Sequence, residues 1–90
     1  MTAHNVFYEG RVQGVGFRYT VHQIATGFDV TGWIRNLPDG RVELLAAGEA
    51  DELEAFLQAI RDSGLGSFIR KEAASEVPAP AKLRGFEIVA

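Results

Sequence analysis

The stretch GRVQGVGFR, residues 10–18, places two glycines directly before an arginine, where the hydrophobic pattern changes from that of a strand to that of a helix. Glycine reaches backbone conformations that other residues rarely adopt and lets a ligand approach the main chain closely. Successive N–H groups in such a loop, with the free N–H groups of a first helical turn, form a cradle for an anion. Gly14 and Gly16 therefore indicate an anion site, with a tight strand-to-helix turn as the alternative interpretation.

Arg18 strengthens the anion hypothesis. A cation in the first turn of a helix faces the positive end of the helix dipole, which costs roughly 0.3 to 1 kcal/mol at an exposed position. An anion bound between the two would reverse the sign of that interaction. A solvated surface arginine is the alternative for Arg18.

Two familiar nucleotide-binding motifs are excluded. A dinucleotide fingerprint would need a third glycine where Tyr19 stands, and a P-loop would need Gly-Lys followed by Ser or Thr. We therefore expect a cradle for one phosphate rather than for a polyphosphate with magnesium.

The elements that must position this loop follow from the apolar pattern. Val6, Tyr8 and Val12 alternate with polar or mixed residues, which predicts a first strand that ends near Gly14. A helical stripe follows and is expected to end at Gly27. The stripe consists of Phe17, Val21, Ile24, Ala25 and Phe28.

The rest of the chain continues this alternation of strands and helices. Residues 29–36 and 41–47 predict two strands joined by the turn LPDG, residues 37–40. Acidic residues at 49–54 favour the start of a second helix, which we expect to end at Gly64. Residues 67–75 predict a fourth strand and residues 85–89 a short final one, with a proline-marked loop between them.

This order predicts one domain, residues 1–90, with an α+β ferredoxin-like βαββαβ fold. Two helices would cover one face of an antiparallel sheet of four to five strands. The helical crossover makes the first two strands parallel, with the third between them. The glycine loop and Asn36, at the end of the second strand, must then lie at the same edge of the sheet. Asn36 could hold a functional amide there, or it could only form the turn before Leu37 and Pro38.

Composition limits the classes of partner. The chain has no cysteine and no stretch long and apolar enough for a membrane span, so we expect a cytoplasmic protein with no membrane partner. The net charge of −3 with two lysines argues against nucleic-acid binding. Residues 1–41 carry four arginines against three acidic residues, whereas residues 42–90 are strongly acidic, so a small anion should prefer the first half. We expect a monomer.

The motif GRVQGVGFR, followed by GWIRNLPDG at 32–40, resembles the acylphosphatase family. The similarity extends through RVELLAAGEADELEAFLQAI to the closing GFEI, so it covers nearly the whole chain. It thins between Gly64 and Arg84, where SFIRKEAASEVPAPAK departs from the usual pattern of the family. The departure concerns the fourth strand and its loop, not the two motifs.

The resemblance implies an enzyme that hydrolyses a carboxylic-phosphoric anhydride to carboxylate and phosphate, with neither a metal nor an organic cofactor. It implies that Arg18 grips the phosphoryl oxygens and that Asn36 orients the attacking water. The assisting main-chain N–H groups would be those of Gln13, Gly14, Val15, Gly16 and Phe17. Leu37 stands where some relatives have a hydroxyl residue, so any auxiliary role of that hydroxyl is missing here.

The residue chemistry agrees with this expectation. An acyl phosphate expels a carboxylate whose conjugate acid has a pKa near ~4, so a general acid is scarcely needed. Phosphoryl transfer depends mostly on positioning and charge stabilisation, which an arginine, N–H donors and an amide can supply. The alternative is a non-catalytic module on the same fold that binds a phosphate, a metabolite or RNA.

Three further residues are interpreted structurally. We expect His4, near a frayed N-terminus, and His22, on the polar side of the first helix, to have ordinary surface roles without metal binding. Trp33 could shape substrate access, but sheet packing is the favoured interpretation.

Overall fold

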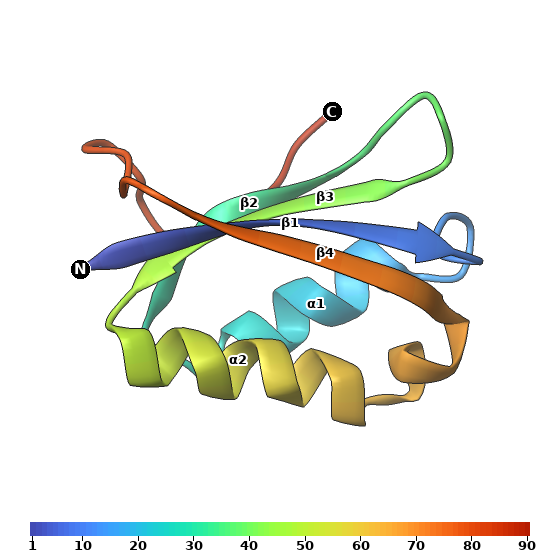
Figure 1. The fold of residues 1–90 in the computed structure, drawn as a ribbon, viewed down its shortest axis with the longest axis horizontal. Helices are drawn as coiled ribbons and strands as arrows, with labels where there is room; N and C mark the ends of the chain where they lie inside the picture. Colours follow the sequence, from blue (N-terminus) through green and yellow to red (C-terminus); the bar gives the residue numbers. More distant parts are fainter.

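Two layers, a sheet and a pair of helices, make up the computed structural model, which describes residues 1–90 (Figure 1). The strands are β1 (Thr2–Gly10), β2 (Val30–Asn36), β3 (Val42–Gly48), β4 (Ile69–Val77) and β5 (Phe86–Ile88). The helices are α1 (Phe17–Ala25) and α2 (Ala50–Asp62), and a 3-10 helix, η1 (Gly64–Phe68), follows α2. Both α-helices lie on one face of the sheet, as predicted. Neither is long and apolar enough to cross a membrane.

The sheet has the strand order β4-β1-β3-β2-β5. The prediction that β3 lies between the parallel strands β1 and β2 is confirmed, because β3 pairs antiparallel with both. The sheet is mixed rather than wholly antiparallel, since β5 pairs parallel with β2. The connection after β4 runs back to the opposite edge of the sheet, so the chain enters β5 in the direction of β2.

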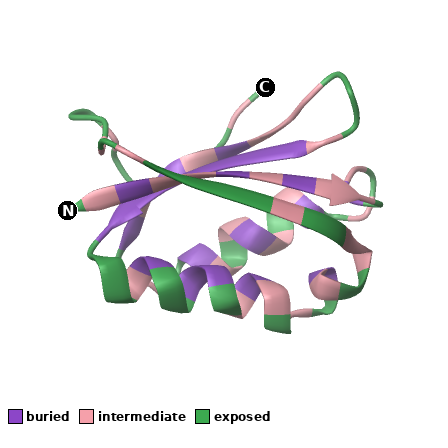
Figure 2. Cartoon of the chain, viewed as in Figure 1, coloured by how far each residue is buried: buried purple, intermediate pink, exposed green.

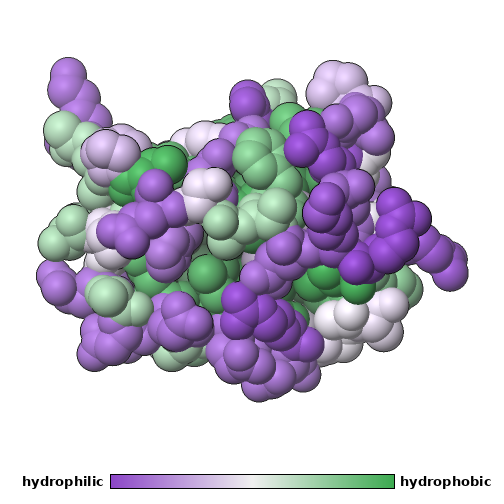
Figure 3. All heavy atoms as spheres, in the orientation of Figure 1, coloured by the Kyte–Doolittle hydropathy of each residue, from purple (hydrophilic) through white to green (hydrophobic).

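The core lies between the sheet and the helices (Figure 2). Strand residues at alternate positions, such as Val6, Ile34 and Leu44, are completely buried there. The predicted stripe of α1 faces them through Phe17, Val21 and Ala25. Burial of these apolar side chains is the main source of stability in a domain of this size. Hydrophilic side chains cover much of the surface over α2, along the lower edge of Figure 3.

Several element boundaries differ from the sequence prediction. β1 begins at Thr2, before the predicted Val6, and β4 ends at Val77 rather than at residue 75. β1 ends at Gly10, where the pairing with β4 shifts register, and not near Gly14. Val12 lies in the loop after β1, but its side chain is buried in the core, so the apolar alternation continues past the end of the strand. β4 begins at Ile69 rather than at residue 67, because residues 64–68 form the 3-10 helix instead. Apolar and polar residues alternate only weakly along β4, because β4 is an edge strand and most of its side chains are exposed.

Candidate active site

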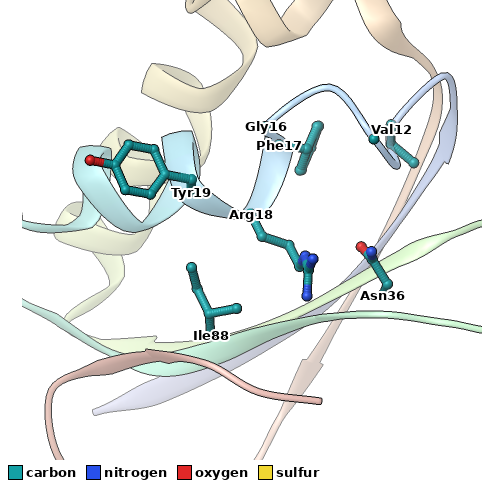
Figure 4. Close-up of a pocket in the computed structure, with 8 residues that line it drawn as sticks. Val12, Gly16, Phe17, Arg18, Tyr19, Asn36 and Ile88 are labelled. Carbon is teal, nitrogen blue, oxygen red and sulfur yellow. The ribbon is translucent and has the colours of Figure 1, made fainter.

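A cavity of about 180 Å³ opens between the start of α1 and the ends of β2 and β5 (Figure 4). Gly14, Gly16, Phe17 and Arg18 line it from the loop and the first turn of α1. Asn36, Ile88, Tyr19 and Val12 complete the lining. The structure therefore brings the glycines, Arg18 and Asn36 together at one edge of the sheet, as predicted from the helical crossover between the first two strands. Gln13 and Val15 belong to the loop but do not line the cavity.

The loop before α1 depends on two glycines in the left-handed region. Gly14 has φ 77° and Gly16 has φ 79°, and beyond the adjacent residues no atom lies within 4 Å of where a Cβ would stand on either one. The backbone angle, rather than crowding, therefore favours glycine at both positions. Gly16 is the N-cap residue of α1, and no side chain accepts a hydrogen bond from the first turn of the helix. None of the backbone N–H groups from Gln13 to Phe17 donates to an acceptor within the protein.

The start of α1 is fixed by the core beneath it. Phe17, its first residue, is buried, and its ring centroid lies 5.1 Å from that of Tyr8 on β1. Burial raises the pKa of the Tyr8 phenol, whose hydroxyl has no hydrogen-bond partner. The hydrophobic contact therefore holds the first helical turn against the sheet, and the next residue, Arg18, lies at the cavity.

Arg18 is half-buried and makes no ion pair or side-chain hydrogen bond within the protein. Its guanidinium lies in the cavity beside the Asn36 side chain (Figure 4). The side chain lines a concavity next to N–H groups that have no partner, so Arg18 is not a fully exposed surface arginine. A half-buried cation in this setting suits an anionic ligand.

Asn36 occupies the last position of β2, on the side of the strand that faces the helices. Its Oδ1 atom is buried without a hydrogen-bond partner, and its amide makes no hydrogen bond within the protein. The preceding residue, Arg35, points to the other face, where its Nε donates to Glu43 Oε1 at 2.8 Å. Buried amides are normally hydrogen-bonded, so the unpartnered oxygen of Asn36 indicates a ligand or water as its partner.

Gln13 has a side-chain role that the sequence did not suggest. Its Nε2 donates to Leu37 O at 2.8 Å and to Arg41 O at 2.9 Å, so both amide protons bind the base of the β2–β3 hairpin. This contact ties the glycine loop to the residue directly after Asn36. The partners are 24 and 28 residues away in sequence, and no local pattern signals such a contact.

Trp33 and the two histidines lie outside the cavity. Trp33 packs on the open face of the sheet, with the Arg35 guanidinium carbon 5.2 Å from its ring, so the packing interpretation is confirmed. His22 is half-buried, 6.2 Å from the ring of Phe86, and not fully on the surface. His4 is not at a frayed end, because it lies within β1 and its Nδ1 is buried.

The comparisons with known proteins agree along the whole chain. The family model for acylphosphatase matches residues 4–88. The acylphosphatase of Trichormus variabilis is 44% identical over 84 residues, which cover 93% of this chain and 82% of the relative. The acylphosphatase of Bacillus licheniformis is 41% identical over 87 residues, 97% of this chain and 93% of the relative.

A solved structure shows the same fold. The crystal structure of acylphosphatase from Bacillus subtilis matches with a TM-score of 0.90 at 36% identity and covers 100% of both chains. The structural match includes residues 64–84, where the sequence resemblance thins. The chain belongs to the acylphosphatase family of hydrolases.

Proposed function

We propose that this chain hydrolyses acyl phosphates to a carboxylate and inorganic phosphate, and that Arg18 and Asn36 are its catalytic residues. The observation that carries the proposal is that three sets of polar groups without protein partners meet at one cavity. These are the N–H groups of the loop residues that line the cavity (Gly14, Gly16 and Phe17), the guanidinium of Arg18 and the amide of Asn36. The family match supports the reaction.

In the proposed reaction, the oxygen of a water molecule bonds to phosphorus while the bond from phosphorus to the acyl oxygen breaks. The electron pair of that bond leaves with the carboxylate, and one proton of the water passes to a phosphate oxygen or to solvent. The products are therefore a carboxylate and dihydrogen phosphate or its conjugate base. The carboxylate is a weak base, so it leaves without a general acid.

Each residue has one task in this scheme. Arg18 and the loop N–H groups bind the nonbridging phosphoryl oxygens and stabilise their charge in the transition state. Asn36 accepts a hydrogen bond from the attacking water at Oδ1 and so directs a lone pair of the water toward phosphorus. Gln13, Gly14, Val15, Gly16 and Phe17 contribute main-chain N–H groups to substrate binding. No group of three or more His, Cys, Asp or Glu side chains is placed to hold a metal, and no step of the scheme needs one.

The first experiment measures hydrolysis of benzoyl phosphate in the presence of a chelator. We expect turnover by the wild type and its near loss in Arg18→Ala and Asn36→Ala. Arg11→Ala is the matched control, because Arg11 is an exposed arginine next to the same loop that does not line the cavity. An inactive wild type, or activity lost to the chelator, would contradict the proposal.

Competitive inhibition by inorganic phosphate separates the two roles. Arg18→Ala should weaken phosphate inhibition strongly, because it removes the charged ligand of the phosphoryl oxygens. Asn36→Ala should lower kcat with less effect on the inhibition constant, because its partner is the water. Equal weakening of phosphate binding in both variants would refute this division of roles. A non-catalytic binding module would bind phosphate without turnover.

The simplest form of this proposal is a monomeric domain of residues 1–90 that acts in the cytoplasm on a small acyl phosphate, without nucleic acid. Sedimentation at enzyme-assay concentration would test the oligomeric state.

A further inference from the structure

Large apolar side chains are rarely exposed in this protein, and two of the three that are exposed border the catalytic cavity. They are Tyr19, 65% exposed, and Ile88, 41% exposed, while the third is Met1 at the N-terminus. Single exposed apolar residues need no explanation, but two that meet at one functional cavity do. We propose that Tyr19 and Ile88 form a subsite for the acyl group, and that the enzyme prefers acyl phosphates with an apolar acyl group. This inference rests on the proposed function.

The size of the cavity limits how much of an acyl group it can enclose beside the phosphate. Pockets that enclose a whole drug-sized ligand have volumes of roughly 300 to 1,000 Å³. The cavity here, about 180 Å³, is smaller and contains the phosphate-binding groups. An acyl group too large for the space beside the phosphate would extend to the rim of the cavity, where Tyr19 and Ile88 are exposed.

The in-line geometry of phosphoryl transfer indicates on which side of the cavity the acyl group lies. In phosphoryl transfer the attacking and leaving oxygens lie roughly in line on opposite sides of phosphorus. Asn36 directs the water, so the acyl group leaves on the side that faces away from Asn36. Figure 4 shows Ile88 and Tyr19 on the other side of the Arg18 guanidinium from Asn36. The apolar pair thus lies on the side where the scheme places the leaving group.

Strand pairing fixes the position of Ile88. Ile88 is the register partner of Ile34 in the parallel β2–β5 pair, and Val89 N donates to Ile34 O at 3.0 Å. The exposure of Ile88 is therefore set by the sheet and is not a property of a loose chain end. Tyr19 follows Arg18 in the first turn of α1 and is exposed, and its ring lies beside the helix and points away from the Arg18 guanidinium (Figure 4).

Charge at the cavity favours an apolar rather than a charged acyl group. Arg18 is the single charged side chain that lines the cavity, and the phosphate occupies it in the proposed scheme. No second charged side chain would therefore be present at the cavity to pair with a carboxylate or an ammonium group on the acyl group. An aromatic ring or branched alkyl chain would instead cover Tyr19 and Ile88 and remove their apolar surface from water.

The test compares kcat/KM for benzoyl phosphate and acetyl phosphate in the wild type, Tyr19→Ser, Ile88→Ser and the double variant. We compare the ratio of the two values between proteins, because the intrinsic reactivity of each substrate then cancels. The ratio should fall roughly fivefold to tenfold in the double variant, as expected for loss of a partly exposed apolar contact. The inhibition constant of inorganic phosphate should change little, because phosphate does not reach the rim.

Leu83→Ser is the matched control, because it removes a partly buried aliphatic side chain on the open face of the sheet. It should leave the ratio unchanged. If Ile88→Ser does not fold, Tyr19→Ser still tests the subsite at a well exposed position. If the ratio of the two kcat/KM values is unchanged in the double variant, including the case in which both values fall equally, the subsite proposal is overturned while the hydrolytic function stays intact. Absence of turnover of either substrate by the wild type would instead refute the proposed function.

Discussion

Arg18 and Arg61 occupy half-buried positions at different helix ends, and the protein uses them in opposite ways. Arg61, near the end of α2, donates from Nη2 to Glu72 Oε2 at 2.6 Å and from Nη1 to Gln58 Oε1 at 3.1 Å. Arg18 has no partner in the protein. The polar groups around Arg61 bind one another, whereas those around Arg18 have no partner within the protein, as the proposed function requires. Functional sites commonly keep groups in states that stability alone would not favour.

The same contrast separates two neighbouring amides. Both protons of the Gln13 amide are donated to the β2–β3 hairpin, whereas the Asn36 amide makes no hydrogen bond within the protein. One amide therefore connects the glycine loop to the hairpin, and the other has no partner within the protein, which agrees with its proposed role. Variants that separate activity from stability test this comparison.

Arg18→Ala should give the largest effect. We expect kcat/KM for benzoyl phosphate to fall by about 10³-fold, the lower range for an arginine that stabilises a transferring phosphoryl group. The urea midpoint should barely change, because the side chain makes no contact of its own that holds the fold. Enzyme assays and urea unfolding of the same preparation check both parts. A clear loss of stability would show that Arg18 also supports the fold.

Gln13→Leu should reduce kcat by roughly 10- to 100-fold, since small displacements of catalytic groups carry costs of that order. The leucine keeps a similar size but cannot donate to Leu37 or Arg41, so the loop and Asn36 lose their fixed spacing. Stopped-flow or steady-state assays measure kcat and KM separately. Gln58→Leu, at an exposed amide of α2, is the control and should leave kcat unchanged. A variant with normal kcat and lower stability would assign Gln13 a structural role only.

Arg61→Ala should lower the free energy of unfolding by about 1 to 3 kcal/mol, because it leaves the largely buried Glu72 carboxylate without its partner. We expect kcat/KM to stay at the wild-type value. Urea unfolding measures the stability, and adding Glu72→Gln in a double-mutant cycle measures the coupling between the two side chains. Loss of activity in the folded variant would mean that the two regions are not independent.

Asp39→Asn should have the smallest effect. Hydrogen bonds from the backbone N–H and side chain of Arg41 hold the pKa of the Asp39 carboxyl below its ordinary value of 3.8. A lowered pKa in the folded state stabilises the fold above pH 3.8, and this contribution is lost as the pH falls through the folded pKa. Thermal unfolding at several pH values should therefore show a small difference between wild type and variant at neutral pH. The difference should vanish in strong acid, and one that persists there would have another origin.

The sequence predicted most of the fold because local signals agreed with the tertiary structure. The helical stripe that begins at Phe17 and the alternation in β2 both describe faces that the structure buries. The prediction was wrong where a loop residue joined the core, as Val12 does, and where a 3-10 helix replaced the start of β4. Apolar periodicity reports burial, and burial occurs outside regular elements as well.

The sequence by itself determined the chemical groups of the candidate site: glycines that expose N–H groups, Arg18 beside them, and Asn36 at the end of a strand. The strand order followed from the handedness of the crossover, so even the shared edge was predictable. Only the tertiary structure decided that Gln13 binds the hairpin, that the Asn36 oxygen has no partner, and that Ile88 is exposed beside Arg18. These features depend on contacts between residues far apart in sequence. Such contacts are set by how strands and helices pack, and local patterns carry no record of them.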